Sequence, residues 1–195
     1  MPIGAERRRP GRPPLADSEG PATAERLLAA AATACAERGF EAVTLGDVAG
    51  RAGVSASAIY NHYGDKAQLL VAAGRWALGR LFPVTDAKMT PRDVAEAFLQ
   101  PSFAESRQLI LELHTASQRH VDVADLVREW NDEHAAALAL RTSGRDRAAR
   151  VTAFFALLLG LCHIDTLGSI GAEAKAVRKQ AFAMVDALFP EGSGG

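Results

Sequence analysis

The sequence has no continuous apolar run of the roughly 18 residues that a membrane-spanning helix requires. We therefore expect no membrane span. Its start is basic and has no apolar stretch behind it, so no secretory signal is expected. Cysteine is also scarce: Cys35 and Cys162 lie far apart and match no metal or redox spacing. We expect buried free thiols in a cytoplasmic protein.

Positive charge is another feature that the sequence has little of. The net charge is −1, and the only lysines among the 195 residues are Lys66, Lys88, Lys175 and Lys179. A protein that binds nucleic acid through bulk charge is thereby disfavoured. Arginines are nevertheless concentrated before residue 13, where they outnumber the single acidic residue. Any nucleic-acid site must therefore depend on local geometry.

Motifs of catalysis and metal binding are missing as well. None of the five histidines has an acidic residue three positions before it, the spacing that metal sites in helical bundles use. We find no nucleophile motif, phosphate-binding loop or dinucleotide fingerprint. The sequence therefore predicts no enzyme, no metal site and no cofactor.

Helical periodicity dominates what is present. Residues 1–20 are rich in proline, glycine and arginine and predict a flexible arm, and 191–195 predict a disordered tail. No β-type alternation persists for more than a few residues between them. We expect an all-α fold of about nine helices, with the last two near 145–168 and 172–189. The predicted domains are a helix-turn-helix unit over 21–66 and an effector-binding and dimerisation unit over 67–190.

Two short helices joined by a glycine-containing turn are predicted near the N-terminus. Thr44 is placed to cap the first of them, with Asp47 three residues on. Gly53 permits a left-handed turn, Val54 fills the corner, and Ser55 is placed to cap the second helix. This arrangement is a helix-turn-helix, in which the second helix enters the major groove of DNA. Many enzymes contain such a pair, so the surrounding residues decide its meaning.

Those residues resemble the DNA-binding head of the TetR family of transcriptional regulators. The agreement runs without a gap from Thr23 to Leu69 and covers about a quarter of the chain. It includes Glu37-Arg-Gly-Phe40, Ala52-Gly-Val-Ser55 and Ala58-Ile-Tyr-Asn-His-Tyr-Gly-Asp-Lys66. The sequence departs from the common pattern at Tyr63, where phenylalanine is commoner, at Cys35, where a larger side chain often packs, and at Gly46.

The resemblance implies which residues contact DNA, and their chemistry supports the same roles. Hydroxyl, imidazole and ammonium groups suit phosphate oxygens, whereas Asn61 pairs with adenine and alanine methyls touch thymine. An arginine-rich segment containing Gly11-Arg-Pro13 resembles AT-hook binders of the minor groove; the alternative is a solvated, unstructured start. The expected DNA-binding residues are Thr44, Ser55, Ala56, Ser57, Ala58, Tyr60, Asn61, His62 and Lys66, with Arg7, Arg8, Arg9 and Arg12 in the arm.

An all-helical unit attached to such a head, by the resemblance, encloses a cavity for a small-molecule effector of unknown identity. Polar residues on otherwise apolar helices would give the cavity its specificity, and His114 is the best placed of them. A role in the hydrophobic core is the competing interpretation for each residue. The candidate cavity residues are Trp76, Phe98, Phe103, His114, Trp130, Phe155 and His163.

The last two predicted helices carry apolar residues at helical spacing, and the resemblance implies that they form the interface of a homodimer. Burial within one chain is the alternative. The expected interface residues are Phe154, Leu157, Leu158, Leu161, Ile164, Phe182, Val185, Leu188 and Phe189.

The predicted function is a dimeric regulator, most often a repressor in such families, that an effector releases from a pseudo-palindromic operator. A second hypothesis is a helical binding module whose head no longer reads DNA. Its basis is the uncharged reading surface and the missing side chain at Gly46.

Overall fold

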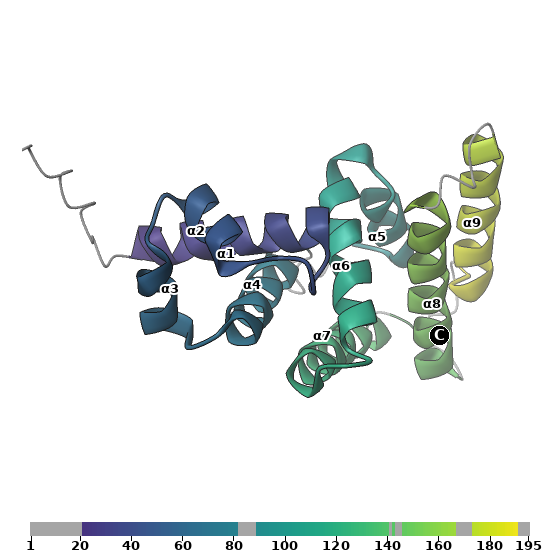
Figure 1. Ribbon diagram of the computed structural model, residues 1–195. Helices are drawn as coiled ribbons and strands as arrows, with labels where there is room; N and C mark the ends of the chain where they lie inside the picture. Colours follow the sequence, from purple (N-terminus) through teal and green to yellow (C-terminus); the bar gives the residue numbers. More distant parts are fainter. Residues whose placement is uncertain (1–20, 82–88, 141, 143–145, 167–172, 191–195) are drawn as a thin grey trace, which may run out of the picture.

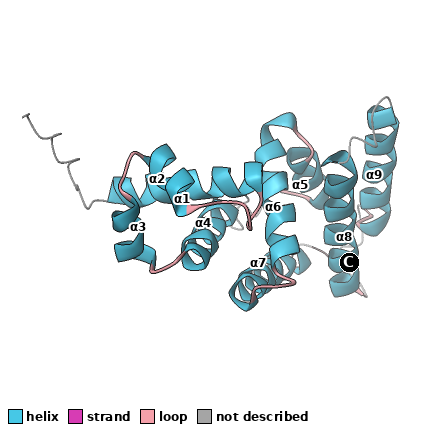
Figure 2. Ribbon diagram, viewed as in Figure 1, coloured by secondary structure: helices cyan, strands magenta, loops and turns pink. Residues whose placement is uncertain are grey.

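A computed structural model describes residues 21–81, 89–140, 142, 146–166 and 173–190. Over these residues the chain forms nine α-helices and one short 3-10 turn, and Figure 2 shows no strand among them. The all-α prediction is confirmed, and so is the expected number of helices. The predicted arm and tail lie outside the described residues.

Figure 1 labels the helices in chain order. Their bounds are α1 Pro21–Arg38, α2 Leu45–Ala52, α3 Ala56–Tyr63, α4 Lys66–Leu81, α5 Pro91–Phe98, η1 Pro101–Phe103, α6 Ala104–Ala116, α7 Val121–Ala139, α8 Arg147–Thr166 and α9 Ala174–Leu188.

The caps of α2 and α3 form as the sequence predicts. The hydroxyl of Thr44 accepts from the backbone N–H of Asp47, whose carboxylate accepts from the backbone of Thr44 in return. Ser55 accepts from the backbone N–H of Ala58. Gly53 ends α2 with φ +68°, a left-handed conformation that glycine adopts without a steric penalty. The turn therefore fixes α3 at a defined angle to α2.

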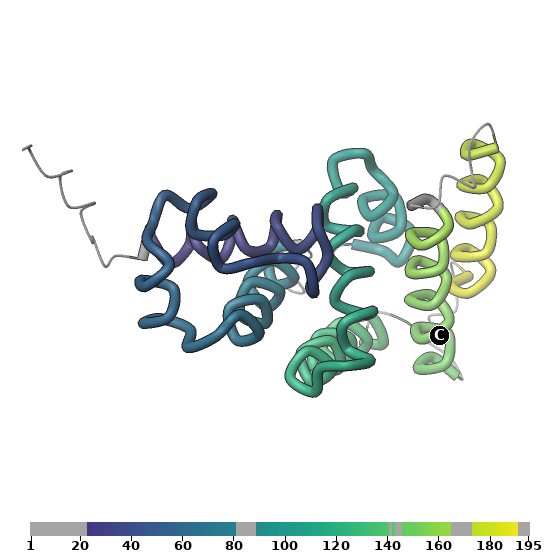
Figure 3. Tube along the Cα trace, viewed as in Figure 1, coloured from purple at the N-terminus to yellow at the C-terminus, as the bar shows by residue number. Residues whose placement is uncertain are grey.

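One continuous hydrophobic core joins α1–α3 to the rest of the chain. Leu27 of α1, Val48 of α2 and Ile59 of α3 have no exposed surface. Helix α1 also packs along α4 and α6, as Figure 3 shows for the α1–α4 pair. The three-helix head, defined as α1–α3, is therefore supported by helices that belong to the predicted C-terminal unit.

Helix α4 leaves the head and crosses α6 and α7 at very close range. A methyl group on Gly74 would lie 3.0 Å from Cδ2 of Leu126 and 3.2 Å from Cδ1 of Leu113. Both leucines are buried. A side chain at this position would require both leucines to shift by a few tenths of an ångström, so glycine permits the close crossing that connects α4 to α6 and α7.

Helices α8 and α9 lie side by side at the end of the molecule opposite α3 (Figure 1). Over Arg147–Ile164, α8 is long and apolar enough to span a membrane by length and composition, although the sequence predicts no span. Only 22% of this stretch is buried within the chain. Core helices of soluble proteins meet the same criterion, so this finding marks α8 as an apolar helix that the chain leaves largely uncovered.

Candidate nucleic-acid interface and ligand cavity

The outer face of α3 presents a row of polar side chains. Tyr60 is 56% exposed, and Ser57, Asn61 and His62 are exposed beside it. Ile59 points the other way and is fully buried. The eight-residue helix is too short to be stable alone, so this packing orients it. The predicted reading face is therefore a free surface.

Two of the three remaining α3 candidates have restricted access. The Ser55 hydroxyl caps the helix and also lies 2.9 Å from the Ser57 hydroxyl. Ala58 is half-buried, and Ala56 is exposed. Ala56 is thus better placed than Ala58 to reach a base edge, and Ser57, unlike Ser55, makes no capping bond that DNA would have to break.

Thr44 uses its polar groups within the capping box. Its hydroxyl donates to Oδ2 of Asp47 over 2.6 Å, and its backbone N–H donates to the same oxygen over 3.0 Å. These bonds hold the pKa of the Asp47 carboxyl below its usual value. A phosphate at this end of α2 would have to compete with that carboxylate for the Thr44 hydroxyl.

Lys66 also has structural partners. Its Nζ donates to the backbone carbonyl of Glu41 over 2.9 Å and to that of Phe40 over 3.3 Å. It lies 6.0 Å from the centroid of the Phe40 ring. The ammonium group thereby fastens the first turn of α4 to the loop between α1 and α2, and one of its three N–H donors is left for another acceptor.

Two exposed ion pairs that the sequence analysis did not identify connect α1 to α2. Arg38 pairs with Asp47 at 2.5 Å, and Arg51 pairs with Glu37. Opposite charges nine and fourteen residues apart give no periodic signal, so these pairs become visible only once the helices are placed. They restrict how α2 moves on α1. The arm arginines Arg7, Arg8, Arg9 and Arg12 lie outside the described residues.

A cavity of about 370 Å³ lies where α6, α7 and α8 meet the end of α5. Four of the predicted residues line it, namely Phe98, His114, Trp130 and Phe155. Residues distant in sequence therefore come together as expected. The other lining residues are Asn131, Asp132, Ala135, Thr152, Ala156, Leu158 and Leu159.

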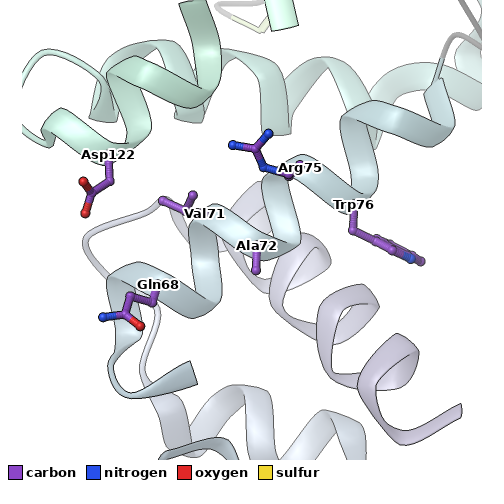
Figure 4. Close-up of a pocket in the computed structure, with 6 residues that line it drawn as sticks. All are labelled: Gln68, Val71, Ala72, Arg75, Trp76 and Asp122. Carbon is purple, nitrogen blue, oxygen red and sulfur yellow. The ribbon is translucent and has the colours of Figure 1, made fainter. Parts of the chain in front are cut away.

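Three predicted cavity residues do not line this cavity. Trp76 lines a separate groove on α4, where it stacks on Arg80 at 5.0 Å. Figure 4 shows its indole pointing away from Val71 and Asp122. Phe103 is half-buried in η1, and His163 is exposed near the end of α8; neither lines the cavity. Residue type alone suggested these three, and the direction of each side chain from its helix decided against them.

The polar groups of the cavity have a defined hydrogen-bonding state. Nδ1 of His114 lies 2.9 Å from the carbonyl of Ile110, so this nitrogen donates and the neutral ring keeps Nε2 as an acceptor. The Thr152 hydroxyl donates to the carbonyl of Ala148. The buried Nε1 of Trp130 has no hydrogen-bond partner among the described residues. A bound molecule could supply the missing acceptor.

The predicted dimer residues divide into two groups. Phe154, Leu158 and Val185 are buried inside the chain, so these three are corrected to core residues. Phe154 packs edge-on against Phe189 at 5.6 Å. The other predicted residues are half-buried or, for Ile164, 45% exposed. Helical phase explains the correction, because these three positions face inward, whereas Ala153 and Met184, which were not predicted, are exposed.

The head touches the turn between α6 and α7 through a second polar contact. Nε2 of His120 donates to Glu41 over 2.8 Å, and the His120 ring lies 4.8 Å from that of Phe40. The bond from His120 lowers the pKa of Glu41. Lys66 and His120 therefore hold the same loop from α4 and from the α6–α7 turn.

Comparison with known proteins agrees with this geometry. Residues 27–73 match the family model described as bacterial regulatory proteins, tetR family. The repressor KstR2 of Mycolicibacterium smegmatis is 31% identical over 83 residues, covering 40% of each chain. The regulator BetI of Rhizobium meliloti is 36% identical over 87 residues, covering 43% of each chain. These matches span less than half the length of either relative.

Solved structures resemble the chain over nearly its whole described length. A TetR transcription regulator from Haloarcula marismortui has a TM-score of 0.71 at 18% identity, over 86% of this chain and 98% of that one. A transcriptional regulator from Saccharomonospora viridis in complex with choline has a TM-score of 0.69 at 21% identity, over 84% and 95%. At these identities the likeness establishes the fold, in which the head is followed by a helical body.

Proposed function

Since this chain belongs to the tetR family of bacterial regulatory proteins, we propose that it is a sequence-specific repressor that a small-molecule effector releases from its operator. The observation that carries the proposal is the exposed row of Ser57, Tyr60, Asn61 and His62 on a helix whose other face is buried. A major groove admits one such helix. The site of action is the cytoplasm, where bacterial DNA lies.

A homodimer is the second part of the proposal. The uncovered apolar surface of α8, with Ile164 and the small residue Gly160, suits close packing against a second copy. Two-fold pairing of α8 and α9 would leave both α3 helices outside the interface, because α3 lies at the opposite end of one chain from these two helices (Figure 1). Successive major grooves would receive them about 34 Å apart, which requires a pseudo-palindromic operator.

Effector release is the third part. The cavity borders α6 and α7, and α4 crosses these two helices at Gly74. A ligand that fits only one arrangement of α6 and α7 would therefore change the angle of α4 and the spacing of the heads. Such a ligand shifts the equilibrium only by its differential affinity for the two arrangements, which is typically about 1–3 kcal/mol.

A helical binding module without DNA recognition is the competing function. The observation in its favour is that Thr44 and Lys66, two expected phosphate ligands, already hold partners within the chain. The reading face also carries no fixed positive charge.

Fluorescence anisotropy against DNA from upstream of the protein's own gene, with a scrambled duplex as control, separates the two functions. Measurements at several salt concentrations are needed, because phosphate contacts release counterions and make specific binding steeply salt-dependent. The regulator predicts tight, salt-sensitive binding to one sequence. Asn61→Ala should reduce the difference in affinity between the specific and the scrambled duplex, whereas Tyr60→Phe should lower the affinity for both duplexes. Random-sequence selection that recovers no preferred site would favour the module.

A further inference from the structure

The ligand cavity has an unbalanced charge. Among its described lining residues, Asp132 is the only one with a formal charge, and it lies exposed on α7 where solvent reaches the cavity. No lysine or arginine occurs among these residues. An anionic ligand would meet the carboxylate with no cation to offset it, whereas a cation would gain a counter-ion.

Aromatic rings make up much of the rest of the wall. Phe98, Trp130 and Phe155 come from three different helices, α5, α7 and α8, and line the same space. The faces of such rings carry negative electrostatic potential, and they attract cations that lose part of their hydration. Leu158, Leu159 and alanines complete an apolar surface that suits a hydrocarbon body.

The hydrogen-bonding groups add a second requirement. Nε1 of Trp130 is a buried donor without a partner among the described residues, and an indole N–H can only donate. A ligand that carries an acceptor, such as an ether or hydroxyl oxygen, would remove the cost of leaving this donor unpaired. These groups favour a ligand with a positive charge, an apolar body and at least one acceptor oxygen.

We propose that this cavity binds an organic monocation of that description, with Asp132 as counter-ion, the aromatic rings around the charged head and Trp130 Nε1 donating to its oxygen. The inference rests on the proposed function, since this ligand would be the effector. It goes further by stating the chemical class of the molecule.

A matched series of three probes tests the charge requirement. Choline phenyl ether has a trimethylammonium head, an ether oxygen and an aryl body. Its carbon isostere, (3,3-dimethylbutoxy)benzene, has the same shape without charge, and 3-phenoxypropanoate has the opposite charge. The fluorescence of Trp130 reports binding in a Trp76→Phe protein, because the chain has only two tryptophans and Trp76 lies outside the cavity.

We expect the cation to bind at least about tenfold tighter than its isostere, and the anion to bind more weakly than either. Asp132→Asn should reduce the preference for the cation to a few fold. The control is Asp122→Asn. Asp122 is on the same helix but lines the α4 groove, so this variant should keep the full preference for the cation. Equal affinity for cation and isostere, tighter binding of the anion, or failure of all three probes to bind would overturn the proposal.

Separate control experiments test whether the variant folds and whether it binds DNA. Asp132 is exposed, and circular dichroism should show unchanged helix content in its variant. Anisotropy on operator DNA with the same preparations tests the regulator independently. DNA binding without cation binding would contradict the cation-binding cavity and support the regulator. Cation binding by a protein that recognises no DNA would support the cavity and contradict the regulator.

Discussion

At the residue scale, two capping boxes of identical chemistry, one in the head and one in the body, allow an effect on stability to be distinguished from an effect on DNA binding. Thr44 caps α2 with Asp47, and Thr90 caps α5 with Asp93. Thr44→Ala and Thr90→Ala should each cost about 1 kcal/mol, which lowers the Tm of a chain of this size by about 2–4 °C. Only Thr44→Ala should also weaken operator binding. Equal losses of DNA affinity in both variants would show that Thr44 acts through global stability alone.

Lys66 has two possible roles that one variant distinguishes. If its ammonium group only fastens the α1–α2 loop through the carbonyls of Phe40 and Glu41, Lys66→Met lowers stability and leaves the salt dependence of DNA binding unchanged. If it also binds a phosphate, the slope of log affinity against log salt falls by about 0.9. We expect the second result, because one N–H donor is left. Denaturation and anisotropy titrations on the same variant measure both effects.

Much of the candidate site was predictable at this scale, but partners were not. Glycine, serine and threonine signals placed the caps and the turn because those signals act between near neighbours. The bonds of Lys66 to a loop 25 residues earlier depend on how α4 returns to α1. The separation of Trp76 from the α5–α8 cavity could not be predicted for the same reason: a sequence gives a residue's helix but not the neighbour that its side chain meets.

At the element scale, α4 contains two glycines in different surroundings. A methyl group on Gly74 would contact buried leucines at 3.0–3.2 Å, whereas one on Gly79 would meet nothing within 4 Å. Gly79→Ala should therefore raise stability by up to about 1 kcal/mol through helix propensity. Gly74→Ala gains the same propensity but overpacks the crossing, which typically costs 1–3 kcal/mol.

Urea denaturation of both variants measures the difference. We expect Gly74→Ala to be the less stable of the two and to have altered effector response, since it displaces α4 from α6 and α7. If the two variants are equally stabilised, the crossing tolerates a methyl group and α4 is less tightly coupled than the geometry indicates.

The hydrogen bond between His120 and Glu41, which connects the α6–α7 turn to the head, makes a pH-dependent contribution to the stability of the fold. The bond from His120 lowers the folded-state pKa of Glu41, so the contact stabilises the fold above the ordinary glutamate range. That contribution is lost as the pH falls through the lowered folded value. Glu41→Gln should therefore be less stable than the parent protein near neutral pH, and the difference should shrink in acid. Thermal unfolding at a series of pH values checks it; a constant difference would contradict the assignment.

Helix positions followed from periodicity, whereas helix contacts did not. The last two helices were expected at 145–168 and 172–189 and are observed at Arg147–Thr166 and Ala174–Leu188. Which side of each helix faces inward depended on the helices packed against it: α6, α7 and α9 for α8, and α5 and α8 for α9. Apolar spacing alone marks both core and interface positions, so Phe154, Leu158 and Val185 were assigned to the wrong one.

At the scale of the whole molecule, the uncovered face of α8 and α9 predicts self-association. Ile164 of α8 and Met184 of α9 are exposed apolar residues, whereas Val121 is also apolar and is 73% exposed at the start of α7. Ile164→Glu and Met184→Glu would each place two charges in a two-fold interface, where burying an unpaired charge is costly. Val121→Glu changes the same property outside it and is the matched control.

Analytical ultracentrifugation should find the parent chain and Val121→Glu as dimers, with both interface variants shifted toward monomer at micromolar concentration. Loss of the dimer should also weaken binding to a full operator far more than to a half-site, because one recognition helix then acts alone. The half-site comparison separates this cause from a damaged head, which would weaken both equally. A parent chain that sediments as a monomer and still binds the full operator tightly would exclude the paired arrangement of α8 and α9.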